Sequence, residues 1–190
     1  GDLPLDEVHG ILEIARELKA GTGDGPRLTG RTVGMLFFRR SLRTRTSFEA
    51  ALHQLDGHTI NLSAKSDVWD LEDREGAAMD GRAREHVKDA ARVLSEYVDA
   101  LAIRPAPEGQ SWRADRRDHE IKTWAKFAQV PVVNMESALW HPLQALADLM
   151  TLRESLGDLH GKRLCISWVQ SPEPATAAVT HSLLQAAVRE

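Results

Sequence analysis

Runs of apolar residues alternate along this chain with segments whose apolar residues recur every three or four positions. The apolar runs are typical of buried strands in a parallel sheet, and the periodic segments are typical of amphipathic helices. We predict strands at residues 32–38, 58–62, 100–103, 130–135 and 161–168. We predict helices at residues 4–20, 48–57, 84–97, 116–128, from 141 onward, and at about 173–188.

The alternation of strands and helices predicts an α/β fold, a parallel sheet with helices on both faces. We expect residues 1–156 to form this domain and residues 157–190 to be the opening strand and helix of a second α/β domain. Ligands of such sheets bind outside the carboxyl ends of the strands. Arg43, Arg104 and His141 all follow predicted strands, so we expect them to converge at one edge.

Composition narrows the class of protein. Hydrophobic residues make up 42% and charged residues 27% of the 190 residues, as in an ordinary globular domain. A net charge of −4 argues against general nucleic-acid binding. The single Cys165 excludes an internal disulfide and suits a reducing compartment. Because no apolar run is long enough to cross a bilayer and the start does not resemble a signal peptide, we expect a cytoplasmic protein.

The densest candidate chemistry lies between the first predicted strand and the helix after it. Four arginines fall between Arg39 and Arg45, and Ser41, Thr44 and Thr46 add hydroxyl groups. The free N–H groups at a helix N-terminus favour an anion, and guanidinium forks suit phosphate or carboxylate. The alternative is a solvated basic face. Placement after a strand and before a helix favours a site for a small phosphorylated ligand.

A long polar stretch, residues 63–81, contains an unusual tryptophan. Trp69 is flanked by acidic residues in a segment without clear periodicity. An exposed tryptophan indicates a ligand or a partner surface, and the alternative is that Trp69 packs on its own domain. The glycine-rich residues 21–25 follow a helix where a nucleotide-binding loop would follow a strand, so we interpret them as a linker.

Two motifs carry a family resemblance. The run from Ser41 to Arg45 resembles the Ser-x-Arg-Thr-Arg motif of aspartate and ornithine carbamoyltransferases, and the run from His141 to Gln144 resembles their His-Pro-x-Gln motif. The tryptophan in the long loop, Trp69, resembles the loop tryptophan of the N-acetylornithine and N-succinylornithine carbamoyltransferase branch. Residues 79–81, 91–94 and 134–136 resemble the same branch.

The resemblance implies an enzyme that transfers the carbamoyl group of carbamoyl phosphate to an amine, without a cofactor or a metal. It also implies a homotrimer in which the tryptophan reaches the phosphate site of a neighbouring subunit. The catalytic residues it implies are Arg104, His141 and Gln144. The residues it implies for carbamoyl phosphate binding are Ser41, Leu42, Arg43, Thr44, Arg45 and Trp69.

The predicted elements give these residues physical roles. His141 at a helix N-terminus should stay neutral and donate a hydrogen bond to the carbonyl oxygen, because the dipole disfavours imidazolium. Gln144, one turn on, could hold the carbamoyl NH2 through its amide oxygen. Arg104 would reach phosphate and carbonyl oxygen. The alternatives are a helix cap for His141 and a surface ion pair for Arg104.

The chain also departs from the branch. Arg39 and Arg40 replace its usual Asn-Pro, and Arg84 stands where the branch has no arginine, facing a succinyl carboxylate or solvent. The downstream amine-binding motif is absent. The leading hypothesis is an N-acylornithine (acetyl or succinyl) carbamoyltransferase of arginine biosynthesis. The alternatives are an ornithine carbamoyltransferase and a non-catalytic carbamoyl-phosphate-binding fragment, whereas net charge and the lack of interleaved aromatic residues disfavour an RNA-binding module.

Overall fold

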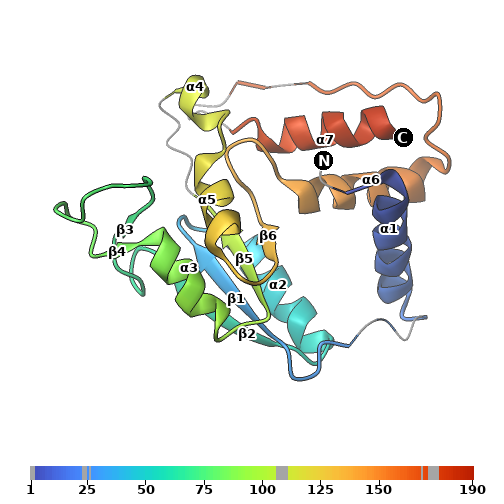
Figure 1. Cartoon of the computed structure of the whole chain (residues 1–190). Helices are drawn as coiled ribbons and strands as arrows, with labels where there is room; N and C mark the ends of the chain where they lie inside the picture. The colour runs from blue at the N-terminus through green and yellow to red at the C-terminus, as the bar shows by residue number, and fades with distance from the viewer. Residues whose placement is uncertain (1–2, 23–24, 26, 106–110, 168, 171–175) are drawn as a thin grey trace. The chain divides into compact units, whose positions relative to one another are not determined.

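The computed structural model describes the chain except residues 1–2, 23–24, 26, 106–110, 168 and 171–175 (Figure 1). The chain divides into two compact units. One unit comprises residues 27–138, and the other combines residues 1–26 with residues 139–190. The boundary expected after residue 156 stays a prediction.

The unit of residues 27–138 contains a parallel four-stranded sheet in the order β2-β1-β5-β6. Its strands are β1 (Thr32–Phe37), β2 (His58–Ser63), β5 (Ala100–Arg104) and β6 (Val132–Asn134). The register pairs Phe37 with Ser63 on one side and with Arg104 on the other. The carboxyl ends of β1, β2 and β5 therefore coincide. The predicted parallel sheet is confirmed.

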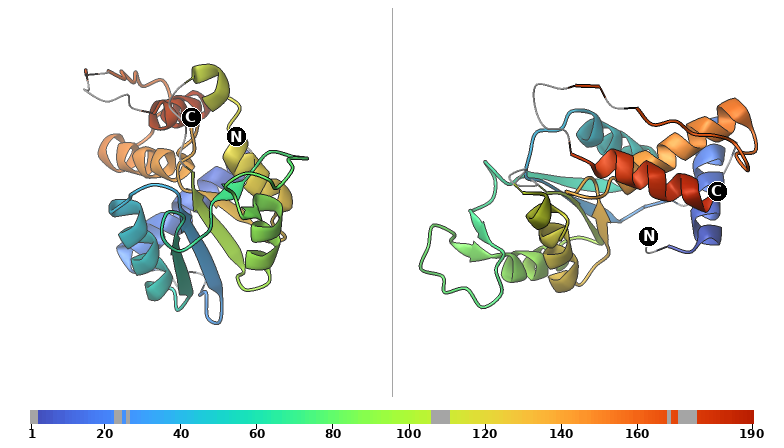
Figure 2. Two further views of the ribbon diagram at one scale, coloured as in Figure 1. Left: turned by 90° about the vertical axis from the view of Figure 1, so that its left-hand side faces the viewer. Right: turned by 90° about the horizontal axis from the view of Figure 1, so that it is seen from above.

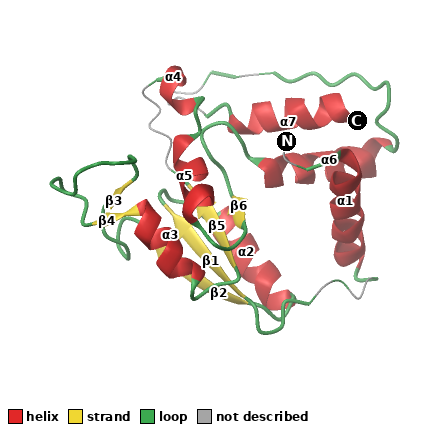
Figure 3. Ribbon diagram, viewed as in Figure 1, coloured by secondary structure: helices red, strands yellow, loops and turns green. Residues whose placement is uncertain are grey.

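Helices cover both faces of this sheet (Figures 2 and 3). Side chains of successive strand residues point to opposite faces, so Met35 and Phe37 pack with Phe48 of α2 (Arg43–Gln54). Leu36 packs on the other side, in a core with Trp124 of α5 (His119–Phe127) and with α3 (Val87–Ser95). Burial on both faces explains why the strands read as continuous apolar runs.

The long polar stretch of residues 63–81 contains a short strand, which pairs with a second short strand at residues 85–86; periodicity did not predict either strand. Strand β3 (Leu71–Glu72) pairs in parallel with β4 (Glu85–His86). Helix α3 therefore begins at Val87 and not at Arg84 as predicted, because residues 85–86 are extended. The His86 ring then caps the helix by accepting a hydrogen bond from the Lys88 N–H.

The helix predicted at residues 116–128 also begins later than predicted, at His119. A separate turn, α4 (Trp112–Asp115), precedes α5, and Asp118 between them has a left-handed backbone with φ of 50°. The buried Asp118 carboxylate accepts hydrogen bonds from the Ser137 hydroxyl at 2.7 Å and the Ala138 N–H at 3.0 Å. These long-range contacts compensate the strain of a left-handed aspartate, and local sequence carries no signal for them.

The other unit consists of α1 (Leu5–Ala20), α6 (Pro142–Leu156) and α7 (Ala178–Arg189), with α6 packed against both other helices. Ion pairs join Lys19 to Glu154 at 2.8 Å and Arg153 to Glu190 at 2.5 Å.

The strand predicted at residues 161–168 is wrong for the described residues 161–167, which form no strand. An isolated strand has no neighbour to accept its backbone hydrogen bonds. None of the described helices is long and apolar enough to span a membrane.

Candidate anion-binding site

The first component of the site is the turn between β1 and α2. Helix α2 begins at Arg43, and its N-cap residue is Leu42, whose side chain is 82% exposed and makes no capping hydrogen bond. The first N–H groups of a helix have no intrahelical acceptor, so an external anion can take that role. The Thr46 hydroxyl, predicted as a phosphate donor, instead donates to the Leu42 carbonyl at 2.9 Å.

The second component is Arg104, the last residue of β5. Its Nη1 donates to the Thr44 hydroxyl at 2.7 Å, which joins the end of β5 to the first turn of α2. The Phe38 N–H donates to the Arg104 carbonyl at 3.0 Å and extends the β1–β5 ladder. Two predicted site residues that are far apart in sequence therefore lie together. Arg104 is not a surface ion-pair residue, because its side chain is only 14% exposed.

Burial and charge both act on Arg104. Burial is the largest cause that lowers the pKa of its guanidinium, and the positive charges of Arg39 and Arg43 act in the same direction. The negative charge of Glu136 opposes them. The guanidinium groups of Arg39 and Arg43 are thus close enough to act on that of Arg104. Such a cluster of positive charge favours binding of an anion.

Glu136 is a site residue that sequence reasoning missed. It follows β6, its side chain is 10% exposed, and its carboxylate contacts both Arg39, at 2.8 Å, and Arg104. A signal was present in the sequence. Glu136 follows a predicted strand just as Arg104 does, so the edge rule applied to Arg104 also applies to Glu136.

Arg45 is held by other residues of the same unit. Its guanidinium lies 4.1 Å from the centre of the Phe37 ring and donates to the Asn61 side-chain oxygen. The Asn61 amide in turn donates to Glu49 of α2. These contacts connect β2 to α2 and support the turn. They indicate that Arg45 has a structural role whether or not it also contacts a ligand.

Trp69 projects from the long loop. Its side chain is 60% exposed, and the Arg84 guanidinium lies 4.6 Å from the ring centre. The neighbouring Val68 packs on the core of the unit, and the Arg84 N–H donates to the Asp70 carbonyl at 3.1 Å. The loop is therefore anchored beside Trp69 while the indole itself stays outside the core. The alternative in which Trp69 packs into its own domain does not fit this exposure.

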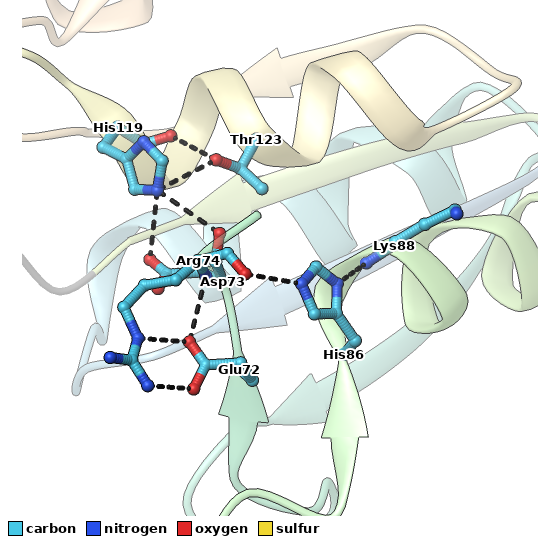
Figure 4. Close-up of polar contacts among 7 residues, drawn as sticks. All are labelled: Glu72, Asp73, Arg74, His86, Lys88, His119 and Thr123. Atoms are coloured by element: carbon cyan, nitrogen blue, oxygen red, sulfur yellow. Dashed lines mark hydrogen bonds and ion pairs between the residues drawn. The ribbon is translucent and has the colours of Figure 1, made fainter. Parts of the chain in front are cut away.

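Polar contacts tie the rest of this loop to α3 and α5 (Figure 4). His86 Nε2 lies 3.1 Å from the Arg74 carbonyl oxygen, and His119 Nε2 lies 3.7 Å from Asp73 Oδ2. Arg74 forms a two-pronged ion pair with Glu72, through Nε at 2.9 Å and Nη2 at 2.7 Å. Hydrogen bonds from Arg74 lower the pKa of Glu72 to about 2.

His141 and Gln144 belong to the unit of residues 1–26 and 139–190. His141 is the N-cap residue of α6, and its backbone N–H donates to the buried Ser182 hydroxyl of α7 at 2.7 Å. The Gln144 amide donates to Asp148 at 2.9 Å. Their predicted convergence with Arg43 and Arg104 stays a prediction. Ser182 was missed because no sequence pattern indicates that α7 supports α6.

The described residues contain no group of three or more histidine, cysteine, aspartate or glutamate side chains that could hold a metal ion. The side chains gathered at the end of β5 are instead guanidinium groups, a hydroxyl and one carboxylate. Such donors suit a phosphate or carboxylate ligand.

Comparisons with known proteins agree with this chemistry. Residues 1–154 match the model of the aspartate/ornithine carbamoyltransferase, carbamoyl-P binding domain. An N-acetylornithine carbamoyltransferase of Xanthomonas campestris pv. campestris is 42% identical over 167 residues, which cover 87% of this chain and 49% of the relative. The chain thus spans about half the length of the curated relatives it matches.

Solved structures give the same result. An acetylornithine transcarbamylase complexed with acetylcitrulline superposes with a TM-score of 0.93 at 39% identity, covering 98% of this chain and 56% of that one. A glutamate-to-serine variant of N-acetyl-L-ornithine transcarbamylase, complexed with carbamyl phosphate and N-succinyl-L-norvaline, gives a TM-score of 0.92 with the same identity and coverage. The chain belongs to the aspartate/ornithine carbamoyltransferase family.

Proposed function

We propose that the chain binds carbamoyl phosphate and serves the transfer of its carbamoyl group to the side-chain amine of an N-acylated ornithine, a step of arginine biosynthesis. The observation that carries the proposal is the contact between Arg104 and Thr44. It brings a largely buried guanidinium to a helix N-terminus at the carboxyl edge of the sheet. These are the donors that a phosphate dianion requires.

The phosphate would lie against Arg43, the Thr44 hydroxyl and the backbone N–H groups that follow Ser41 and Leu42. Arg104 would bridge the phosphate and the carbonyl oxygen, where negative charge develops as the amine attacks. A carbon–nitrogen bond then forms, the carbon–oxygen bond to phosphate breaks, and the amine proton can pass to the departing phosphate. Supporting this assignment, Arg104 is already oriented by Thr44 and Glu136.

The family resemblance also gives proposed roles to two residues of the unit formed by residues 1–26 and 139–190. A neutral His141 would donate a hydrogen bond to the carbonyl oxygen, and Gln144 would hold the carbamoyl NH2 through its amide oxygen. The bond from His141 N–H to Ser182 fixes the backbone at the start of α6 and supports this role. The amide oxygen of Gln144 is the atom that would accept, since its nitrogen donates to Asp148.

Trp69 would act in a neighbouring subunit of a homotrimer in the cytoplasm, where its exposed indole would cover the phosphate site. The acceptor would carry an acetyl or a succinyl group. Two observations bear on this choice. A related variant is described as complexed with N-succinyl-L-norvaline, and the exposed Arg84 beside Trp69 offers a positive charge to a succinyl carboxylate.

The test is calorimetric titration of the chain with carbamoyl phosphate, followed by an assay of carbamoyl transfer to ornithine, N-acetylornithine and N-succinylornithine. Binding with turnover of an N-acyl acceptor supports the proposal. Preferred turnover of free ornithine would show that the acceptor is ornithine and not an N-acylated ornithine. Binding without any turnover would reduce the proposal to a carbamoyl-phosphate-binding module, and absence of binding would refute it.

A further inference from the structure

One carboxylate, that of Glu136, is shared between two guanidinium groups. Arg39 Nη2 lies 2.8 Å from Glu136 Oε1, and Arg104 donates from Nη2 to Oε2. The side chains of Glu136 and Arg104 are 10% and 14% exposed, and that of Arg39 is 30% exposed. Little solvent screens these charges, so each pairing changes the charge that the others present to a ligand.

The pairing with Glu136 would compete with a bound anion. A carboxylate that bonds to Arg104 neutralises part of the charge that the proposed phosphate site requires. The Nε atom of Arg104 is buried and makes no hydrogen bond to the described residues, so acceptors among these residues do not satisfy the whole guanidinium. The charge that Arg104 presents to a phosphate therefore depends on whether Glu136 pairs with Arg104 alone or also with a second cation.

We propose that Arg39 is a positioning residue of the anion site, which holds the Glu136 carboxylate and thereby leaves Arg104 a net positive charge for phosphate. The inference rests on the proposed function of the site. Arg39 contributes in two ways. It gives Glu136 a second cation, and its ion pair is with Oε1 whereas Arg104 donates to Oε2.

The chain provides a matched control in Arg40. This residue is adjacent to Arg39 and has the same charge, but its side chain is exposed. Arg39→Gln and Arg40→Gln therefore remove the same charge, and only the first removes the contact with Glu136. Titration with inorganic phosphate should show that Arg39→Gln weakens binding about three- to tenfold. Arg40→Gln should weaken it by less than about twofold at physiological salt.

A double-variant cycle distinguishes action through Glu136 from direct contact with the anion. Glu136→Gln alone should strengthen phosphate binding, because the competing carboxylate is gone. In that background, Arg39→Gln should lose most of its effect. Arg39→Lys, which keeps the charge, should recover most of the wild-type affinity. Thermal unfolding of each variant checks that the unit is intact.

Three results would overturn the inference. These are equal effects of Arg39→Gln and Arg40→Gln, an undiminished effect of Arg39→Gln beside Glu136→Gln, and weaker binding by Glu136→Gln in a folded protein. In each case a wild-type chain that binds phosphate preserves the proposed function. A wild-type chain that binds neither phosphate nor carbamoyl phosphate would remove both proposals together.

Discussion

Arg104 at the end of β5 donates a hydrogen bond to the Thr44 hydroxyl in the first turn of α2, although 60 positions separate the two residues. The parallel pairing of β1 with β5 makes this contact possible, since Phe37 and Arg104 are in register at the carboxyl ends of their strands. The chain leaves β1 and enters α2 within a few residues. The sheet edge thus unites a buried guanidinium, a hydroxyl and a helix N-terminus.

Replacing Thr44 by valine should weaken phosphate binding and leave the fold intact. Valine keeps the shape of threonine but removes the hydroxyl that orients Arg104, which costs about 0.5–1.5 kcal/mol or about two- to tenfold in affinity. The control is Ser47→Ala, because the Ser47 hydroxyl donates to the Thr44 carbonyl at 3.1 Å on an exposed helix surface. Calorimetry with inorganic phosphate measures both. Equal affinities for the two variants would contradict the role of the Thr44 hydroxyl.

Replacing Arg84 by glutamine should loosen the Trp69 indole. The cation–π contact at 4.6 Å is exposed, and such contacts contribute about 0.5–1 kcal/mol. We expect little change in the melting temperature but a narrower, more averaged 19F NMR signal of 5-fluorotryptophan at Trp69, assigned with Trp69→Phe. Arg82→Gln is the control, since Arg82 is an exposed arginine two residues away. An unchanged Trp69 signal in Arg84→Gln would show that Arg84 does not order the ring.

The proposed role of Trp69 in a neighbouring subunit predicts complementation. Trp69→Ala should weaken carbamoyl phosphate binding with little loss of stability, because the indole is 60% exposed. Mixed oligomers of Trp69→Ala and Arg43→Ala chains should contain some sites with both residues intact. Binding should therefore exceed that of either variant alone. If oligomers that are verified as mixed bind no better than the single variants, Trp69 acts within its own chain.

The lowered pKa of Glu72 predicts that the free energy of unfolding falls in acid. Arg74 lowers the pKa of folded Glu72 to about 2, below the value of about 4.3 expected for an unfolded chain. The contribution of this carboxylate is therefore present above pH of about 4.3 and is lost as the pH falls toward 2. Glu72→Gln should flatten the fall in stability within this window, measured by urea unfolding at several pH values. Glu17→Gln, on exposed α1, serves as the control, and an equal slope in both variants would contradict the prediction.

Most of the fold was predictable from local sequence because the strands are buried on both faces. Apolar runs such as that from Thr32 to Phe37 cannot be mistaken for half-exposed strands, and Arg43 and Arg104 follow from the carboxyl-edge rule. The misplaced starts of two helices depend on distant contacts. The start of α5 is set by the bonds of Asp118 to residues 137 and 138, and the start of α3 is set by the pairing of β4 with β3.

The site shows the same division. The motif residues were predictable from the sequence, but the contacts that orient them were not. Glu136 and Ser182 act on Arg104 and His141 from distant positions, and only the fold brings them together. Arg39 belongs to the arginine cluster of the predicted phosphate site, yet its pairing with Glu136 could not be deduced from the sequence.

The most direct test of the proposed carbamoyl phosphate site is calorimetric titration of the wild-type chain and of Arg43→Ala with carbamoyl phosphate. Loss of a charge-assisted contact costs about 1.5–3 kcal/mol, so the affinity of Arg43→Ala should fall about ten- to a hundredfold. Arg40→Ala, which removes the same charge from an exposed neighbouring position, should stay close to wild type. An unchanged affinity in Arg43→Ala would contradict the assignment of this sheet edge as the carbamoyl phosphate site.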